Sequence, residues 1–296
     1  MKYQRRFIKR KTFLGSMFKI SCWLFLVFAA LMIYLFFTNS MFAVELKQVR
    51  QARADFFSIG IDVSGTIKRD VLEDVKDALI FRLRKLVGDS ILSYNVSIFG
   101  TPGCGSHGID DIISKGSPQN PGSFEIRVGS RIKNISISNK TIDPGMPLTT
   151  PFYCFLENIL PESRGGRVII FSDLVNDDYG CKKQYSFPEE VITEFGRDKK
   201  GRIIFFYASP YVPGEYDVSK SKEKLINKQK MFIKKMEDMG KKGKVRVVFY
   251  KIPDDSGKRK IFFKTHLKNT MPETKFEIVW SRVSNIVSSM VSGVRG

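Results

Sequence analysis

Residues Phe56–Thr66 read FFSIGIDVSGT, and the rest of the chain can be ordered around this stretch. A short apolar run of this kind indicates a buried strand. Asp62, Ser64 and Thr66 then stand at alternate positions, and apolar residues recur at helical spacing from Ile67 to about Leu86. The stretch therefore predicts a strand that delivers three oxygen-bearing side chains to one edge of a sheet.

Further apolar strands alternate with helical segments. We expect strands at residues 94–99, 167–171, 203–208 and 245–250, and helices at 150–160, 188–195, 220–239 and 276–291. This order predicts an α/β fold with a doubly wound, mostly parallel central sheet and helices on both faces. Ligands of such sheets bind beyond the carboxyl ends of the strands, where Asp62, Thr150 and Asp173 fall.

Two regions fit this alternation less simply. Residues 100–122 are rich in Gly and Pro and predict a loop, and residues 124–138 predict a β-hairpin that turns at Gly129–Ser130. Together they form an insertion near residues 100–148. A C-terminal extension from about residue 252 begins with a turn, and residues 261–265 predict an extra strand in it.

The N-terminal region has a different composition. Seven basic residues and no acidic residue precede Ile20–Phe37, an uncharged apolar run of 18 residues. A bilayer core is spanned by ~20 apolar residues, and the positive charge before the run predicts a cytoplasmic N-terminus. We expect a basic tail at residues 1–19, a transmembrane signal anchor at 20–44, a stalk at 45–54 and an extracytoplasmic domain at 55–296. A cleaved signal peptide is the alternative, with bulky Met41 placed three residues before the best cut.

The formal net charge is +19. A basic excess suggests anionic surroundings, such as lipid, cell-wall polymer or nucleic acid. The chain has no basic motif of the kind that reads nucleic acid, so we expect a Lys-rich solvated surface and no nucleic-acid partner.

The segment Asp62–Thr66 resembles the DxSxS motif of von Willebrand factor A domains. Two further positions agree with that family: Thr150 is followed six residues later by Leu156, and Asp173 ends the apolar strand VIIFSDL. The resemblance covers about residues 55–250. Combined with the predicted anchor, it suggests a membrane-anchored protein of bacterial type.

The resemblance implies a metal-ion-dependent adhesion site made by Asp62, Ser64, Thr66, Thr150 and Asp173. Mg²⁺ prefers oxygen ligands and usually takes only one or two protein carboxylates, so three hydroxyls and two carboxylates suit Mg²⁺, or Mn²⁺. A partner protein would offer a carboxylate to the open position of the ion. Two positions depart from the family pattern: Thr66 replaces a Ser and keeps its oxygen, and Leu174 stands where Gly is common.

Three cysteines, Cys104, Cys154 and Cys181, map to this same edge, whereas Cys22 lies in the predicted span. An oxidising compartment allows one disulfide, and we expect Cys104–Cys181 because both lie on loops that would frame the metal. Cys154 would then be a small buried apolar residue. No cysteine spacing matches a zinc pattern.

We therefore expect a membrane-tethered, extracytoplasmic domain that binds protein through a divalent cation, in an envelope or secretion assembly and not as an enzyme. In a bacterium it would face the periplasm from the inner membrane. One alternative is a divergent Mg²⁺-dependent phosphatase with Asp62 as nucleophile, but Ser64 replaces the second Asp of the DxDxT motif. Another is a structural domain without metal, in which Thr66 and Thr150 cap helices. His107 and His266 are not part of a recognisable catalytic motif. Actin-like sugar kinases carry a similar IGIDxGGT sequence, but a β-hairpin follows it there, whereas here a helix is expected after Thr66.

Overall fold

The computed structural model describes the following ranges: 56–87, 93–116, 120–137, 149–163, 165–178, 181–198, 201–212 and 218–272. Five single residues, Trp23, Phe25, Glu277, Trp280 and Ser284, are also described. The chain divides into two compact units, Met1–Ala54 and Asp55–Gly296. The fold below belongs to the second unit.

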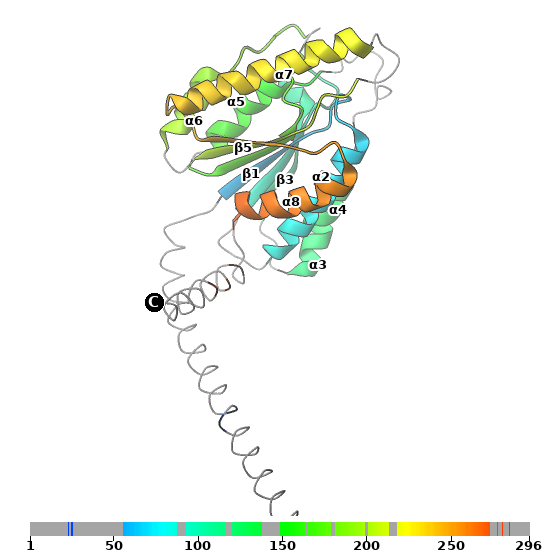
Figure 1. The fold of residues 1–296 in the computed structure, drawn as a ribbon, viewed down its shortest axis with the longest axis vertical. Coiled ribbons are helices and arrows are strands. Elements are labelled where there is room, and N and C mark those ends of the chain that lie inside the picture. Colours follow the sequence, from blue (N-terminus) through cyan, green and yellow to red (C-terminus); the bar gives the residue numbers. More distant parts are fainter. Residues whose placement is uncertain are drawn as a thin grey trace, which may run out of the picture. The chain divides into compact units, whose positions relative to one another are not determined.

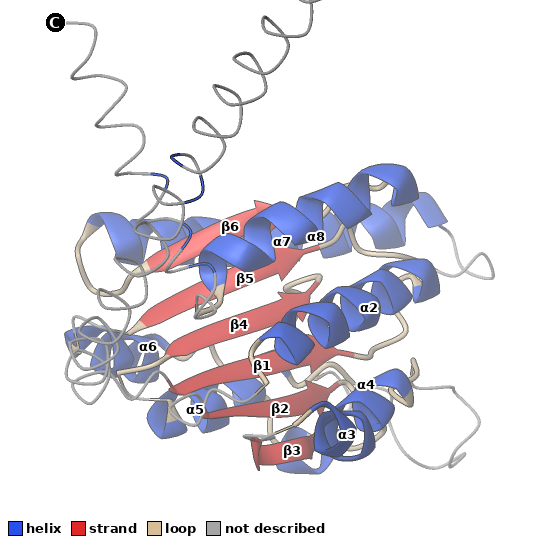
Figure 2. Ribbon diagram, turned by 90° about the horizontal axis from the view of Figure 1, so that it is seen from below, coloured by secondary structure: helices blue, strands red, loops and turns tan. Residues whose placement is uncertain are grey.

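A six-stranded sheet with the order β3-β2-β1-β4-β5-β6 forms the centre of this unit (Figure 2). All neighbouring strands pair in parallel except β2 and β3, which pair antiparallel. The α/β, mostly parallel fold class predicted from the sequence is confirmed. The strands are β1 Phe56–Asp62, β2 Ser93–Phe99, β3 Ile109–Gly116, β4 Arg167–Ser172, β5 Arg202–Tyr207 and β6 Val247–Lys251.

Helices cover both faces of the sheet (Figure 1). Each face has its own apolar core. One core joins the sheet to α2 Arg69–Lys85, α4 Ser130–Lys133 and α8 Ser256–Thr270. The other joins it to α5 Phe152–Glu162, α6 Glu189–Arg197 and α7 Val218–Lys241. The central strands β1, β4 and β5 are mostly apolar because their alternate side chains enter opposite cores. Gly60 on β1 has no side chain because the ring of Phe155 takes that space: a Cβ there would lie 2.4 Å from it.

The predicted hairpin at residues 124–138 is wrong. The segment is helical: α3 Pro121–Phe124, the π-helical turn η2 Glu125–Gly129 and α4 follow one another without a strand. Asn120 caps the start by accepting a hydrogen bond from the Ser123 amide at 2.8 Å, with Pro121 next in line. Phe124, Val128 and Ile132 are spaced by four residues and are all buried, which is a helical face. The β-branched residues between them suggested a strand, but burial against the core decided the conformation.

The loop predicted over residues 100–122 contains β3, the antiparallel edge strand, and a short 3₁₀ turn, η1 Gly105–Gly108. The extra strand predicted at residues 261–265 is also wrong, because these residues lie inside α8. The predicted turn before it is the start of that helix: the Asp255 carboxylate caps the Lys258 amide at 3.0 Å. Phe263 and Leu267 then face the core at helical spacing.

The remaining predicted elements of the second unit agree with the structure within a few residues, except that the helix predicted at 276–291 lies outside the described residues apart from Glu277, Trp280 and Ser284. The predicted membrane span also lies outside them, apart from Trp23 and Phe25. Within the part of the chain that the structure describes, none of the helices has the length and apolarity needed to cross a bilayer.

Candidate metal centre

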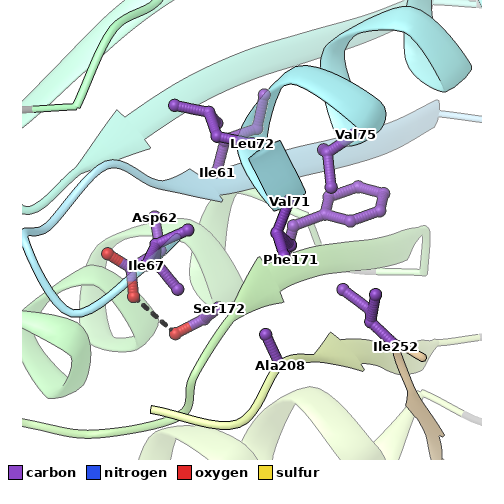
Figure 3. A pocket seen from close by; sticks show the side chains of 10 residues that line it. All are labelled: Ile61, Asp62, Ile67, Val71, Leu72, Val75, Phe171, Ser172, Ala208 and Ile252. Atoms are coloured by element: carbon purple, nitrogen blue, oxygen red, sulfur yellow. Dashed lines mark hydrogen bonds between the residues drawn. The ribbon is translucent and has the colours of Figure 1, made fainter. Parts of the chain in front are cut away.

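Asp62 ends β1 at the carboxyl edge of the sheet and is 1% exposed. Both of its oxygens accept hydrogen bonds: Oδ1 from the Ser64 amide at 2.9 Å and Oδ2 from the Ser172 hydroxyl at 2.7 Å. Ser172 ends the neighbouring strand β4, so the second bond joins two strand ends (Figure 3). Beneath this bond lies a pocket with a mainly apolar lining, between the sheet and α2. Asp62 is therefore fixed in a dry setting.

Ser64 and Thr66 lie in the turn between β1 and α2, and their hydroxyl oxygens are 3.0 Å apart. The turn is packed tightly against the end of β2. Gly100 has a φ of +88°, and a Cβ there would approach the Ser64 amide nitrogen to 2.9 Å. The Thr66 carbonyl accepts a hydrogen bond from the Tyr211 amide at 2.8 Å, which ties the turn to the segment after β5.

Asp173 follows β4 and is completely buried. Its Oδ1 accepts a hydrogen bond from the Val175 amide at 3.0 Å, whereas its Oδ2 is buried without a hydrogen-bond partner among the described residues. The next residue, Leu174, has a φ of 61°, in the left-handed region where Gly is favoured, so the departure from the family pattern is accommodated by an uncommon backbone conformation. Gln229 of α7 holds the segment by donating to the Asp173 carbonyl at 2.7 Å.

The two carboxyl groups have strongly altered pKa values. Burial raises the pKa of Asp62 to about 6, partly offset by hydrogen bonds from Ser64 and Ser172. Burial, and then the charge of Asp62, raise the pKa of Asp173 to about 7. The Thr66 hydroxyl lies close enough to lower the pKa of Asp173, although it makes no hydrogen bond of good geometry to Oδ2. Asp62, Ser64, Thr66 and Asp173 therefore form one connected cluster.

Thr150 is joined to this edge through its backbone. It is 5% exposed and forms an isolated antiparallel bridge with Asp177, which lies four residues after Asp173. Its side chain does not cap α5, since the cap residue is Pro151, and the Tyr153 amide instead donates to the Asn176 side chain at 2.9 Å. Thr66 is not a cap either, because α2 begins after Lys68. The prediction that Thr66 and Thr150 cap helices, which would explain them in a domain without metal, is therefore wrong.

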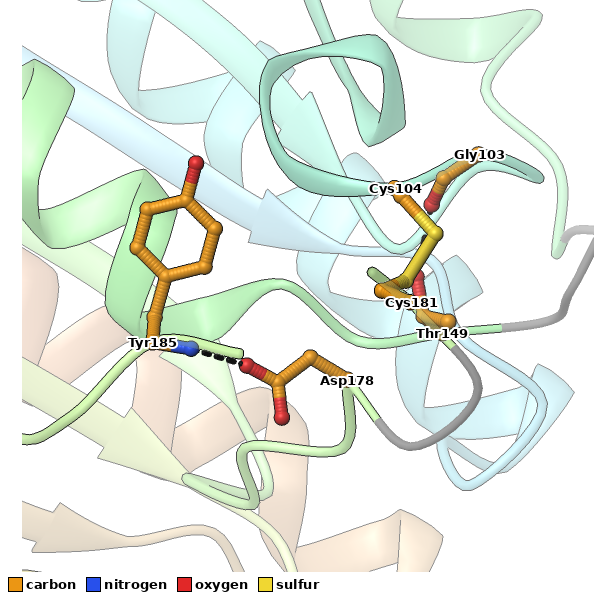
Figure 4. The surroundings of a disulfide bond; sticks show 6 residues. All are labelled: Gly103, Cys104, Thr149, Asp178, Cys181 and Tyr185. Atoms are coloured by element: carbon orange, nitrogen blue, oxygen red, sulfur yellow. Dashed lines mark hydrogen bonds between the residues drawn. A yellow bond between two sulfur atoms is a disulfide. The ribbon is translucent and has the colours of Figure 1, made fainter. Parts of the chain in front are cut away.

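Cys104 and Cys181 form the expected disulfide (Figure 4). It joins η1 to the segment after β4 across 77 residues of sequence. Cys154 is a free, buried cysteine on α5, also as expected. His266 lies on α8 against the rings of Tyr250 and Phe262, and not on a loop.

The donor set suits a hard cation. Oxygen atoms from two carboxyls and several hydroxyls are what Mg²⁺ and Mn²⁺ take, and the Oδ2 of Asp173, which has no hydrogen-bond partner among the described residues, could serve as a ligand. Across the described ranges, no three or more His, Cys, Asp and Glu side chains cluster so as to hold a metal ion, so a thiolate or imidazole site has no support there.

Three side chains of this edge were missed from the sequence. Ser172 could have been noticed, because it ends β4 and directly precedes Asp173. Asn176 and Gln229 gave no signal, since the first lies in an irregular segment and the second resembles a polar residue of an amphipathic helix.

Comparison with solved structures finds similar chain folds at low sequence identity. A von Willebrand factor type A protein from Catenulispora acidiphila has 13% identity and a TM-score of 0.43, over 73% of this chain and 42% of that one. The pilus adhesin SpaC from Lactobacillus rhamnosus GG has 10% identity and a TM-score of 0.42, over 73% and 30%. The PilB minor pilin from Streptococcus sanguinis has 11% identity and a TM-score of 0.40, over 73% and 61%.

The chain thus spans less than two thirds of the length of each of these structures. No protein-family model and no curated protein sequence matches it. The likeness is one of fold and transfers no ligand, partner or activity. The mostly parallel, doubly wound sheet agrees with the fold that the resemblance to von Willebrand factor A domains predicts from the sequence.

Proposed function

We propose that this chain is a membrane-tethered, extracytoplasmic interaction domain that binds a protein partner through a divalent cation. The cation would be held by Asp62, Ser64, Thr66, Thr150 and Asp173. The observation that carries the proposal is the buried Oδ2 of Asp173, which has no hydrogen-bond partner in the described ranges and lies beside a second buried carboxylate.

Two buried carboxyls cannot both ionise without a large loss of stability, unless a cation compensates them. Apolar packing could have removed this loss, yet the sequence places three hydroxyls there as well. Neither Thr66 nor Thr150 has a capping role that would explain its hydroxyl. A cation accounts for the carboxyls and the hydroxyls together.

When bound, a Mg²⁺ or Mn²⁺ ion with so few anionic ligands can accept a further carboxylate from outside. The surface around the cluster leaves room for a partner, since Gly65 is exposed and Tyr211 is 40% exposed. An exposed aromatic ring beside a charged site is a common anchor in protein interfaces.

The tether is proposed from the sequence. The run at residues 20–37 is long enough to span a bilayer, and the seven basic residues before it favour a cytoplasmic N-terminus. A disulfide between Cys104 and Cys181 is what an oxidising compartment such as the periplasm permits. A partner in an envelope or secretion assembly would lie in that compartment.

A phosphatase role for Asp62 has less support. A nucleophile needs an accessible oxygen, but Asp62 is 1% exposed and both of its oxygens accept hydrogen bonds. We therefore propose binding without catalysis.

Titration of the purified full chain with Mn²⁺ tests the proposal. Binding is measured by calorimetry or by the electron spin resonance signal of free Mn²⁺. We expect one site in the wild type, and at least about tenfold weaker binding in Asp62→Asn and in Asp173→Asn, because each loses a carboxylate ligand. Asp111→Asn is the matched control: it makes the same change on β3, where Asp111 accepts a hydrogen bond from Ser97.

A carboxylate probe then tests the partner chemistry. A short Glu-containing peptide should bind in Mn²⁺ and not in excess chelator, and Mn²⁺ should bind more tightly in its presence, because the coupling is reciprocal. Wild-type protein without a Mn²⁺ site would leave only a structural domain. Hydrolysis of p-nitrophenyl phosphate that is lost in Asp62→Asn would instead support the phosphatase.

A further inference from the structure

The segment Thr149–Thr150 is held from two sides at the carboxyl edge of the sheet. On one side, the Thr149 hydroxyl donates a hydrogen bond to the Gly103 carbonyl at 2.6 Å, and both partners are buried. On the other side, the Thr150 amide donates to the Asp177 carbonyl at 2.7 Å, and the Asp177 amide donates to the Thr150 carbonyl at 3.0 Å. The position of Thr150 is therefore set by two segments that are distant in sequence.

The disulfide joins these two segments to each other. Cys104 directly follows Gly103, whose carbonyl lies near Thr149 (Figure 4). Cys181 lies four residues after Asp177. The Asp178 carbonyl accepts a hydrogen bond from the Cys181 amide at 3.1 Å, and its carboxylate accepts one from the Tyr185 amide, so Asp178 also holds Cys181 and Tyr185. We call the closed ring of Gly103, Cys104, Thr149, Thr150, Asp177 and Cys181 the Thr150 clamp.

We infer that the Thr150 clamp positions the Thr150 hydroxyl for the cation, with Thr149 and the Cys104–Cys181 disulfide as positioning residues that do not touch the ion. This inference rests on the proposed function for the cation itself. The disulfide would have a local purpose at the site as well as a general effect on stability.

The reason lies in how the other four candidate ligands are held. Asp62, Ser64 and Thr66 follow directly from β1, and Asp173 follows directly from β4, so the sheet itself places them. Thr150 belongs to none of the described strands, and within the described residues its backbone pairing is the bridge to Asp177. A ligand that must be ordered on binding weakens affinity by the cost of ordering it, and a clamp removes that cost in advance.

Local hydrogen exchange tests the clamp without any metal. In the full chain with chelator, the Thr150 and Asp177 amides should exchange at least about tenfold faster in Cys104→Ala/Cys181→Ala than in the wild type. Loss of the disulfide also lowers global stability, so these rates are compared with those of β1 amides in the same variant. Thr149→Val, which removes only the hydroxyl bond, should give a smaller increase at the same two amides.

Mn²⁺ titration of the same proteins tests the consequence for the site. We expect the Mn²⁺ affinity to be about tenfold lower in Cys104→Ala/Cys181→Ala. In Thr149→Val it should be about fivefold lower, because the net contribution of one hydrogen bond corresponds to about that fivefold change. Thr149→Ser keeps the hydroxyl and Cys154→Ala removes the free cysteine of α5, so both should keep wild-type affinity. A reductant should weaken Mn²⁺ binding by the wild type and leave the double variant unchanged.

Unchanged exchange at Thr150 and Asp177 in the double variant would overturn the clamp. Faster exchange with unchanged Mn²⁺ affinity would overturn its role in the site, since Thr150 would then be mobile without consequence. Absence of any Mn²⁺ site in the wild type would refute the proposed function and the purpose of the clamp, while the exchange data would still report whether the ring holds Thr150.

Discussion

Replacing Asp173 by Asn should change how the stability of the metal-free protein depends on pH. The pKa of Asp173 is raised from 3.8 to about 7, chiefly by burial and then by the charge of Asp62. The folded protein therefore keeps a proton on this carboxyl at pH values where the unfolded chain has lost it. Stability falls as pH rises through this range, because the folded state binds more protons than the unfolded state.

The size of the effect follows from the shift. Each pKa unit corresponds to about 1.4 kcal/mol, so ionising Asp173 should remove roughly 3 kcal/mol of unfolding free energy between about pH 4.5 and about pH 8. Asp62 titrates nearby, with a pKa of about 6, so the loss belongs to the pair. Asn cannot ionise, so Asp173→Asn should remove most of the pH-dependent loss of stability that arises from Asp173. The fold should be kept, because the Asn carbonyl oxygen can still accept a hydrogen bond from the Val175 amide.

Urea unfolding in chelator at several pH values measures this difference. The wild type should lose roughly 3 kcal/mol more than Asp173→Asn as pH rises, whereas Asp111→Asn should follow the wild type. Mg²⁺ at about 100 times its dissociation constant should restore about 2.7 kcal/mol to the wild type at about pH 8 and much less to Asp173→Asn. Parallel pH curves for the wild type and Asp173→Asn would refute the reasoning.

Three further substitutions test the fold around the site. Gly100→Ala should lower unfolding free energy by about 1–3 kcal/mol in urea and weaken Mn²⁺ binding, because a Cβ at φ +88° would lie 2.9 Å from the Ser64 amide nitrogen. Ile132→Ala should lower it by about 2–5 kcal/mol, since this side chain of α4 is completely buried in the core, whereas an exposed hairpin residue would lose little. Arg259→Met should lower it by about 1–3 kcal/mol, because the buried guanidinium joins α8 to Asp70 and Asp74 of α2.

The parallel strands were predictable because their signal is strong and local. FFSIGID, RVIIF and IIFFY are short, mostly apolar runs rich in β-branched and aromatic residues, which is typical of a strand buried on both faces. The carboxyl ends of such strands lie at one edge of the sheet, so the sequence alone predicts that Asp62 and Asp173 lie close together. The disulfide followed from the same reasoning about which loops share that edge.

The region between β2 and α5 was not predictable in the same way. Ile126, Val128, Ile132 and Ile135 have strand-favouring side chains, and the helix forms because Phe124, Val128 and Ile132 reach the core together. Strand propensity is a property of single residues, whereas the helix is stabilised by burying all the apolar side chains of one face together. The strand predicted at residues 261–265 is wrong for the same reason, because Phe263 and Leu267 of α8 face the core together.

The hydrogen bonds around the site lie beyond sequence reasoning because they join distant segments. Gln229 reaches the Asp173 carbonyl across 56 residues, and Thr149 reaches Gly103 across 46. A pattern within one helix or loop has no record of these partners. The sequence could therefore predict the two carboxylates and the three hydroxyls, but not what holds them.

The local structure of the site argues for a ligand more strongly than the motif does. Leu174 adopts a backbone conformation that favours Gly, and a buried carboxylate oxygen of Asp173 has no hydrogen-bond partner among the described residues. Each feature lowers the stability of the metal-free fold, and in a purely structural domain the Asp173 carboxyl would contribute only the hydrogen bond that its Oδ1 accepts from the Val175 amide. Unfavourable features of this kind persist where a bound species offsets them, so cation binding and folding should be coupled at this edge.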